Sequence, residues 1–306
     1  MRIFTDCENR GGLETAQQEQ RSRIERVRDN LAGAGAVIAI ASAKGGVGKS
    51  VVAVNIAAAL ALKGRKVAIV DADLNAPSII RMLAMKPPRG LPMVEGIEPL
   101  AGPHGLRIVS SEMIAGGEAP AISFLEDDGN TPGPAESTQE IGYNDALARM
   151  LSLARFGALD VVIIDVAPGV GRLHQLAQIA PLTNVVIASH SSEQAVVATR
   201  HLIRLAANFG APVTGLIENM AGFNCDGCRS VRPLMPEGSL AGVATEFSLP
   251  ILARLPFDPR LAEASDRGVL FVHQFADTPV GKNLLRLALD VERMIMLGRA
   301  ASSPNA

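Results

Sequence analysis

Residues 44–50, with the sequence KGGVGKS, have the types and spacing suited to binding phosphate. The usual phosphate-loop pattern, G-x-x-x-x-G-K-[ST], requires a glycine at position 43, where Ala43 stands instead. Small residues let successive backbone N–H groups face an anion, and a helix beginning near Lys49 adds the positive end of its dipole. Lys49 would reach the β- and γ-phosphates, and the Ser50 hydroxyl would bind the Mg²⁺ that bridges them. The stretch therefore predicts a nucleotide phosphate site whose contacts come from Gly45, Gly46, Val47, Gly48, Lys49, Ser50 and Val51.

This loop contains two lysines, and only one of them can be the ordinary phosphate lysine. Lys44 is therefore predicted to be a second cation directed at phosphate. The alternative is an inert turn rich in glycine and lysine. It is disfavoured because an apolar run at 37–41 precedes the loop and a helical pattern at 51–63 follows it, as a phosphate loop requires.

The rest of the chain alternates apolar runs with helical segments, as a parallel α/β sheet requires. The runs are rich in Val and Ile and lack polar alternation, which indicates strands buried on both faces. Gly64 and Gly210 follow helical segments and are predicted to end them. We place strands at 37–43, 66–72, 106–110, 160–166, 184–189, 212–218 and 251–255.

Carboxylates follow two of these strands. Asp71 and Asp73 stand at the end of one, and Asp165 at the end of another. In an open parallel sheet, ligands bind at the carboxyl ends of the strands. An aspartate that ends an apolar strand matches the requirement for an acid near Mg²⁺ in a phosphate-loop protein. We assign that role to Asp165.

Composition narrows the classes of partner. The 306 residues include 29 basic and 31 acidic side chains, a formal charge of −2, so no general attraction to nucleic acid or anionic lipid is expected. The absence of Trp and the single Tyr leave little surface for stacking bases, and no nucleic-acid partner is predicted. No run of about 18 apolar residues occurs, and the polar N-terminus lacks a secretory signal, so we expect a cytoplasmic protein.

The chain is predicted to have three parts: a charged N-terminal helix and linker at 1–34, one domain at 35–298, and a polar tail at 299–306. Between 86 and 140 the sequence is rich in Pro and Gly and less regular. The helix predicted at 281–297 has one apolar face but few Lys and Arg residues. It is expected to pack on the sheet of the same chain, without stable membrane association.

Cys225 and Cys228 form a C-x-x-C motif. Taken alone, this motif could be a redox pair, half of a zinc site, half of an iron–sulfur site, or two ordinary thiols. A tetrahedral zinc site or a cubane cluster built only from cysteine requires four thiolates, and the chain has three cysteines. One subunit cannot supply four, whereas two subunits related by a two-fold axis can.

Several of these stretches together resemble the Mrp-type iron–sulfur carriers. This family belongs to the deviant Walker A group, which also includes MinD, ParA and the nitrogenase iron protein. The resemblance rests on KGGVGKS, on DADLNAPS at 71–78, on IDVAPGVGR at 164–172, on ENM at 218–220, on LPFDP at 255–259 and on the C-x-x-C motif. It implies a doubly wound, mostly parallel α/β sheet of the P-loop NTPase, MinD-like type over about residues 35 to 298.

The resemblance also implies roles for individual residues. Lys44 resembles an arginine finger that crosses into the ATP site of a partner subunit, which makes the protein a homodimer. Asp73 would orient the attacking water and stand near Mg²⁺. Asn219 would read the adenine edge, and Pro256 and Asp258 would lie in a second loop on the adenine side. The pair Cys225 and Cys228 would hold a [4Fe–4S] cluster between two subunits.

The implied function is ATP-dependent carriage of an iron–sulfur cluster to apo iron–sulfur proteins. The 164–172 segment departs from the family pattern, because Ala167, Val170 and Arg172 replace Pro, Thr and Asp, so we expect slow ATP hydrolysis. One alternative is a positioning or regulatory ATPase of the MinD/ParA type that acts as a nucleotide-dependent switch. A second is a nucleotide-binding scaffold that hydrolyses ATP poorly or not at all. The C-x-x-C motif favours the carrier.

Overall fold

The structure is a computed structural model, and it describes residues 6–86, 96–113, 136–224, 231–235 and 239–301. Its strands are β1 (Val37–Ala41), β2 (Val67–Ala72), β3 (Leu100–Ala101), β4 (Arg107–Ser110), β5 (Val161–Val166), β6 (Asn184–Ser189), β7 (Val213–Asn224), β8 (Val231–Arg232) and β9 (Ile251–Phe257). Its α-helices are α1 (Asp6–Ala32), α2 (Lys49–Leu62), α3 (Ile79–Met82), α4 (Glu136–Leu153), α5 (Val170–Ile179), α6 (Glu193–Asn208), α7 (Ser239–Glu246), α8 (Pro259–Asp266), α9 (Phe271–Gln274) and α10 (Pro279–Ala301). Two 3₁₀ turns, Pro103–Gly105 and Ser111–Met113, flank β4.

The described strands form one sheet in the order β3-β4-β2-β5-β1-β6-β7-β8, with β9 also paired to β7. All pairings are parallel except those of the two-residue strands β3 and β8, which are antiparallel to β4 and β7. The chain starts near the middle of the sheet at β1 and winds outwards in both directions. The predicted doubly wound, mostly parallel fold is confirmed. All seven predicted strands are present, and β7 continues six residues beyond its predicted end at 218.

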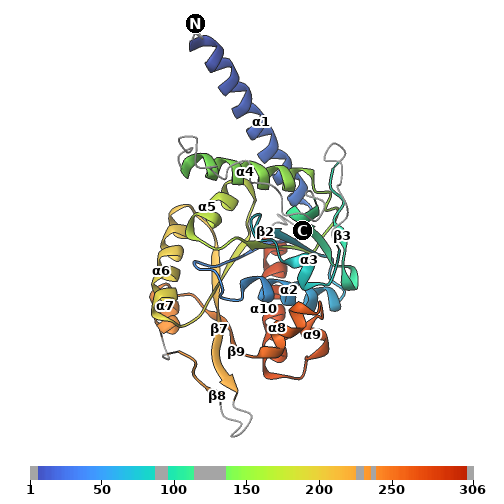
Figure 1. The fold of residues 1–306 in the computed structure, drawn as a ribbon, viewed down its shortest axis with the longest axis vertical. Coiled ribbons are helices and arrows are strands. Elements are labelled where there is room, and N and C mark those ends of the chain that lie inside the picture. The colour runs from blue at the N-terminus through green and yellow to red at the C-terminus, as the bar shows by residue number, and fades with distance from the viewer. Residues whose placement is uncertain (1–5, 87–95, 114–135, 225–230, 236–238, 302–306) are drawn as a thin grey trace, which may run out of the picture.

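Two groups of helices cover the sheet (Figure 1). One group consists of α2, α3, α8, α9 and α10, which pack on one another. The other group consists of α1, α4, α5, α6 and α7. Each of these helices contacts the next one in this order, and α1 also contacts α5. This three-layer arrangement explains why the strands are apolar throughout, since both of their faces are covered.

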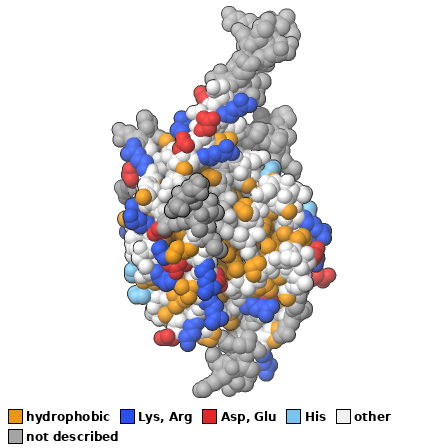
Figure 2. All heavy atoms as spheres, turned by 180° about the vertical axis from the view of Figure 1, so that it is seen from behind, with side chains coloured by type: hydrophobic (Ala, Val, Ile, Leu, Met, Phe, Trp, Pro, Cys, Tyr) orange, Lys and Arg blue, Asp and Glu red, His pale blue; other side chains and the backbone are white. Residues whose placement is uncertain are grey.

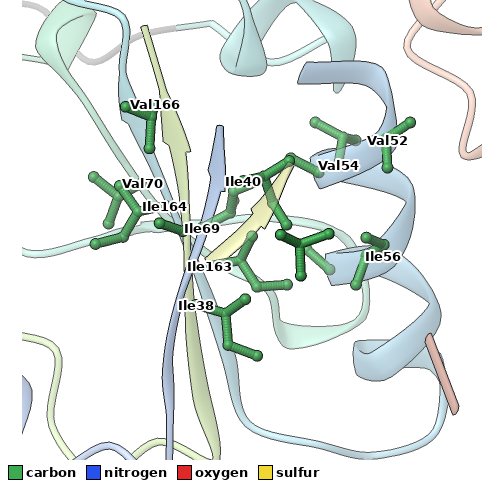
Figure 3. Packing of buried hydrophobic residues seen from close by; sticks show 14 of the residues in the cluster. Ile38, Ile40, Val52, Val54, Ile56, Ile69, Val70, Ile163, Ile164 and Val166 are labelled. Atoms are coloured by element: carbon green, nitrogen blue, oxygen red, sulfur yellow. The ribbon is translucent and has the colours of Figure 1, made fainter. Parts of the chain in front are cut away.

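The core lies between the central strands and α2. Ile163 and Ile164 are neighbours on β5 and point to opposite faces, because successive side chains of a strand alternate. Figure 3 shows Ile163 on the side of α2, where Val52 and Ile56 lie, and Ile164 on the other side. All four side chains are fully buried. β5 therefore presents apolar side chains to both faces of the sheet, as a central parallel strand requires.

Helix ends follow the sequence expectations. Gly64 and Gly210 both adopt positive φ, at 80° and 72°, two residues after the last residues of α2 and α6. Residues with a Cβ rarely adopt this conformation, so glycine ends these helices at little cost. The two turns bring the chain back towards the strands β2 and β7 that follow.

Both terminal helices contact the domain. The apolar side chains Val27 and Leu31 near the end of α1 are buried in the same core as the sheet, although the sequence places a boundary at residue 34. The apolar face of α10, which includes Leu284, Leu287 and Val291, is fully buried against α2 and β9. The prediction that this C-terminal helix packs on the protein's own sheet is confirmed.

Charges are mixed on the surface. On the face shown in Figure 2, Lys and Arg side chains are interspersed with Asp, Glu and hydrophobic side chains. This agrees with the nearly balanced composition. Within the described residues, no helix combines the length and the apolar character that crossing a bilayer requires.

Candidate functional site: a phosphate loop between two switch segments

The phosphate loop connects the end of β1 to the start of α2. Gly46 and Gly48 adopt positive φ, at 76° and 80°, and Gly48 is the residue that precedes the first turn of α2. These conformations turn the loop back over the helix N-terminus, where unpaired N–H groups and the helix dipole favour an anion. The loop lines a cavity of about 210 Å³. The cavity is bounded by residue 42, residues 44–51, Asp73, Met82 and Pro168.

Lys49, which lines the cavity, belongs to a buried ion pair. The Lys49 ammonium donates to Asp165 Oδ1, and it lies 3.3 Å from Ser50 Oγ. Asp165 ends β5, the strand next to β1, so the sheet register brings it beneath the loop. Burial raises the pKa of Asp165, and the neighbouring Lys49 opposes that rise. The sequence assigned Lys49, Ser50 and Asp165 to one site, and the structure brings these three side chains together.

The other carboxylate oxygen of Asp165 takes no part in the bond to Lys49. Its Oδ2 is buried and has no hydrogen-bond partner. A buried carboxylate oxygen without a partner is costly, and hard divalent cations prefer oxygen ligands. The donor set of Asp165 and Ser50 therefore fits Mg²⁺. Within the described ranges, no group of three or more His, Cys, Asp or Glu side chains forms a ready-made metal site.

The segment after β2 is organised by an aspartate to which the sequence gave no role. Asp71 is fully buried and accepts three backbone N–H bonds, from Asp73 at 3.2 Å, Ser78 at 2.8 Å and Ile79 at 3.0 Å. These bonds fold residues 73–78 into a loop over the strand end. Burial, reinforced by the nearby Asp165 carboxylate, raises the pKa of Asp71 to about 7. The sequence feature that could have indicated this role is the presence of two carboxylates, Asp71 and Asp73, at the end of one strand.

Asp73, to which the sequence gave the catalytic role, lies in the wall of the cavity. It is partly exposed, and its Oδ1 accepts a bond from the Ala76 backbone N–H at 3.1 Å. Asp73 and the phosphate loop thus line the same cavity, and the catalytic role of Asp73 remains a prediction. Met82 and Pro168 also line the cavity, and sequence reasoning did not select them.

Lys44 lies at the cavity rim. Its ammonium donates to Gln194 Oε1 on α6 at 3.0 Å, in an exposed contact. Ser42 Oγ donates to the Lys44 carbonyl at 3.0 Å and so fixes the backbone at that point. The two lysines of the loop therefore have different settings, since Lys49 is buried against Asp165 and Lys44 is held at the surface.

Asn219 contacts the loop itself. Its side-chain amide is buried and donates to the Val47 carbonyl at 2.8 Å. A Cβ added at Gly48 would stand 2.2 Å from the same amide nitrogen. β7 thus supports the phosphate loop through one side chain, and glycine at position 48 is required for that approach. The role that the sequence gave to Asn219, adenine recognition, remains a prediction.

The loop that the sequence predicts to lie on the adenine side is at the end of β9. Asp258 caps α8 by accepting from the Arg260 backbone N–H, and both of its carboxylate oxygens also accept from the Arg260 guanidinium. Hydrogen bonding from Arg260 lowers the pKa of Asp258. Neither Asp258 nor Pro256 is among the residues that line the phosphate cavity.

The cysteine pair lies outside the described residues. β7 ends at Asn224 and β8 begins at Val231, so Cys225 and Cys228 stand in the sequence between these two strands. Their role therefore remains a prediction from the sequence.

The last part of the site is the segment after β5. Gly169, at φ 116°, precedes α5, and its N–H donates to the Ser42 carbonyl at 3.0 Å. Arg172 lies in the first turn of α5, where a cation is disfavoured by the helix dipole. Its guanidinium lies over the Tyr143 ring, 4.0 Å from the ring centroid.

This fold and this site define a P-loop NTPase with two lysines in its phosphate loop. A family model described as ParA, NUBPL iron-transfer P-loop NTPase, matches residues 33–292. The chain therefore belongs to this family, as the resemblance of its motifs predicted.

Curated relatives agree with this assignment. An iron-sulfur cluster carrier protein of Saccharolobus solfataricus is 34% identical over 260 residues, covering 84% of this chain and 83% of the relative. One of Methanocaldococcus jannaschii is 35% identical over 254 residues, covering 81% of each.

Solved structures show the same fold. A nucleotide-binding protein from Archaeoglobus fulgidus in complex with ADP superposes with a TM-score of 0.67 at 27% identity, covering 85% of this chain and 95% of that one. The septum site-determining protein MinD of Pyrococcus horikoshii, complexed with Mg-ADP, has a TM-score of 0.59 at 18% identity, covering 86% of this chain and 98% of that one. The latter likeness concerns the fold alone.

Proposed function

We propose that this protein is a homodimeric, ATP-dependent carrier that holds a [4Fe–4S] cluster between two subunits and delivers it to apo iron–sulfur proteins of the cytoplasm. The observation that carries the proposal is the phosphate loop with its buried Lys49–Asp165 pair, joined through Asn219 to the strand that leads to the cysteine pair. Relatives of this chain over most of its length are named iron-sulfur cluster carrier proteins.

The nucleotide half of the proposal uses the residues around the cavity. The loop N–H groups and Lys49 would bind the phosphates of ATP, and Asp73 would orient the attacking water from the opposite wall. Ser50, Asp73 and Asp165 would hold Mg²⁺, which neutralises charge on the phosphate oxygens when it is bound. The unpartnered Asp165 Oδ2 supports this set of ligands.

Lys44 would act across the dimer. Its ammonium makes an exposed hydrogen bond to Gln194, and it can leave such a contact at low cost. In the proposed dimer it reaches the phosphates bound to the partner subunit and stabilises the charge that develops there during hydrolysis. Hydrolysis would then require two subunits. The altered 164–172 segment supports slow turnover.

The cluster half of the proposal uses the end of β7. Cys225 follows Asn224, the last residue of that strand. Phe223 and Phe257 pair across β7 and β9, and both aromatic side chains are exposed. Exposed aromatic side chains are typical of the centres of protein interfaces. Phe223 stands two positions before Cys225 in the sequence, which supports a second copy of the chain as the partner that would complete four thiolates.

A transfer experiment tests this function. The purified protein, loaded with cluster under anaerobic conditions, is mixed with an apo [4Fe–4S] enzyme whose activity reports cluster arrival. We expect the wild-type protein to activate the acceptor and Cys228→Ser to fail. Lys49→Ala is the control for nucleotide dependence and is expected to lose the effect of ATP on transfer. If the protein hydrolyses ATP but never activates the acceptor, the carrier function is refuted, and a MinD/ParA-type switch explains the fold.

A further inference from the structure

Tyr143 is a buried tyrosine that connects α4 to the segment carrying Asp73. Its side chain is 3% exposed, and its hydroxyl donates to the Ala72 carbonyl. Ala72 lies between Asp71, which folds the 73–78 loop, and Asp73 in the cavity wall. A bond to that carbonyl fixes the peptide plane from which Asp73 projects. Tyr143 therefore holds one side of the cavity through the backbone.

The same tyrosine holds the segment after β5. The guanidinium of Arg172 lies 4.0 Å from the centroid of the Tyr143 ring, and Arg172 Nη1 donates to Gln175 Oε1 at 2.9 Å. A cation over an aromatic face is attracted by the ring quadrupole, and more strongly where water is excluded. This contact offsets the unfavourable position of Arg172 in the first turn of α5. The guanidinium is thus held over the ring and beside Gln175.

The electrostatic setting agrees with this geometry. Burial raises the pKa of Tyr143; Arg172 opposes the rise, while Asp73, Asp71 and Asp165 add to it. The hydroxyl therefore stays protonated, able to donate to Ala72, in the field of the same carboxylates that surround the phosphate cavity.

We infer that Tyr143 and Arg172 are positioning residues for nucleotide hydrolysis: together they brace the 71–78 segment against the 164–172 segment and fix Asp73 in the wall of the phosphate cavity. Tyr143 supplies the hydroxyl bond to Ala72 and the ring on which Arg172 stacks. The inference rests on the proposed ATP hydrolysis, but it is independent of the cluster. It gives Arg172, which departs from the family pattern, a role through Tyr143.

Steady-state hydrolysis of ATP by the full-length protein tests the brace. Tyr143→Phe keeps the ring and removes one hydrogen bond, so kcat is expected to fall about five-fold while KM changes by less than about two-fold. Arg172→Gln is expected to lower kcat by a similar factor, and Arg172→Lys, which keeps the cation, to recover part of the loss. The double variant Tyr143→Leu with Arg172→Gln should lose less kcat than the product of the losses in Tyr143→Leu alone and Arg172→Gln alone, because both residues act through one contact.

Arg204→Gln is the matched control. Arg204 lies 5.8 Å from the centroid of the Phe247 ring, away from the phosphate cavity, and this variant should retain the wild-type kcat. If Tyr143→Phe keeps the wild-type kcat while its thermal midpoint falls, Tyr143 is only a core residue and the inference is overturned. Loss of kcat with an unchanged thermal midpoint supports it.

Tyrosine emission provides a readout that does not depend on turnover. Tyr143 is the only tyrosine and the chain has no tryptophan, so the intrinsic emission reports this one side chain. Saturation with Mg²⁺ and a non-hydrolysable ATP analogue should change the emission of the wild-type protein. In Arg172→Gln, the change should fall to less than about half.

Two outcomes separate this inference from the proposed function. If calorimetry shows that the wild-type protein binds no nucleotide, the proposed function fails, and the brace fails with it. If calorimetry shows tight binding but the emission of wild type and Arg172→Gln responds identically, only the brace is overturned.

Discussion

Lys49 and Asp165 form a buried ion pair beneath the phosphate loop, with side chains that are 6% and 0% exposed. The pair joins Lys49, the first residue of α2, to Asp165 near the end of β5, so it links the phosphate loop directly to that strand. Asp165 Oδ2 remains without a hydrogen-bond partner in this arrangement. The proposed magnesium site therefore depends on a carboxylate that has one oxygen paired with lysine and one without a hydrogen-bond partner.

Asp165→Asn is expected to remove the dependence of nucleotide affinity on Mg²⁺. In the wild-type protein, a chelator should weaken ADP binding, measured by calorimetry, towards the affinity of the variant. The variant should be unaffected by the chelator. Breaking one side of a buried pair also costs about 3 kcal/mol of unfolding free energy, measurable by urea titration.

Asp290→Asn is the matched control for that substitution, because Asp290 forms a largely exposed pair with Arg293. It should change the unfolding free energy by less than about 1 kcal/mol and leave nucleotide binding intact. An Asp165→Asn variant that still responds to the chelator as wild type does would remove Asp165 from the metal site.

Asn219→Ala is expected to weaken nucleotide binding about ten-fold, because it leaves the buried Val47 carbonyl unpaired and loosens the phosphate loop. Asn283→Ala serves as its control, since Asn283 makes the same kind of bond, to the Arg254 carbonyl at 2.9 Å, in an exposed position. Equal affinities of both variants, measured by calorimetry, would contradict the support that β7 gives to the loop.

Gly48→Ala tests the close approach of β7 to the loop. Its Cβ would stand 2.2 Å from Asn219 Nδ2, so either that side chain or the loop must shift, and we expect nucleotide binding to be lost. Gly64 has the same φ of 80° with nothing within 4 Å of an added Cβ. Gly64→Ala therefore carries the backbone strain alone, about 1 kcal/mol, and should bind nucleotide normally. Normal binding by Gly48→Ala as well would refute the requirement for glycine.

Lys44→Ala is expected to abolish ATP hydrolysis and to leave ADP affinity within about two-fold of wild type, because its contribution is made only in the transition state. Mixing subunits tests whether it acts across the dimer. A heterodimer of Lys44→Ala and Asp73→Asn has one site with both residues intact if Lys44 crosses to the partner, so mixing two inactive variants should restore turnover. No recovery on mixing would place the action of Lys44 within its own subunit.

Much of the fold follows from the sequence because the strands are short, apolar runs set between helical patterns. Val161 to Ile164 are all buried, and their β-branched side chains in a short run favour a strand over a buried helix. The contacts of α1 were harder to foresee. The sequence predicts only a charged N-terminal helix and linker at 1–34, whereas Val27 and Leu31 are buried in the main core.

The site was predictable where chemistry is local in the sequence. Lys49, Ser50 and Asp165 could be assigned because a loop pattern and a strand-end acid mark them. Tyr143 could not, since nothing around it in the sequence signals that its hydroxyl meets the Ala72 carbonyl 71 positions away. The bond from Asn219 to Val47 is of the same kind, because it depends on the approach of β7 to the loop in three dimensions.

Anaerobic iron–sulfur reconstitution tests the central claim most directly, with iron, sulfide and absorbance measured per dimer for wild type and for Cys225→Ser. The account predicts one cluster per dimer in the wild-type protein, with about four irons and four sulfides, and none in the variant. Cys7→Ser is the control and should retain the cluster. A protein that binds no cluster, or one whose cluster persists in Cys225→Ser, would contradict the shared site.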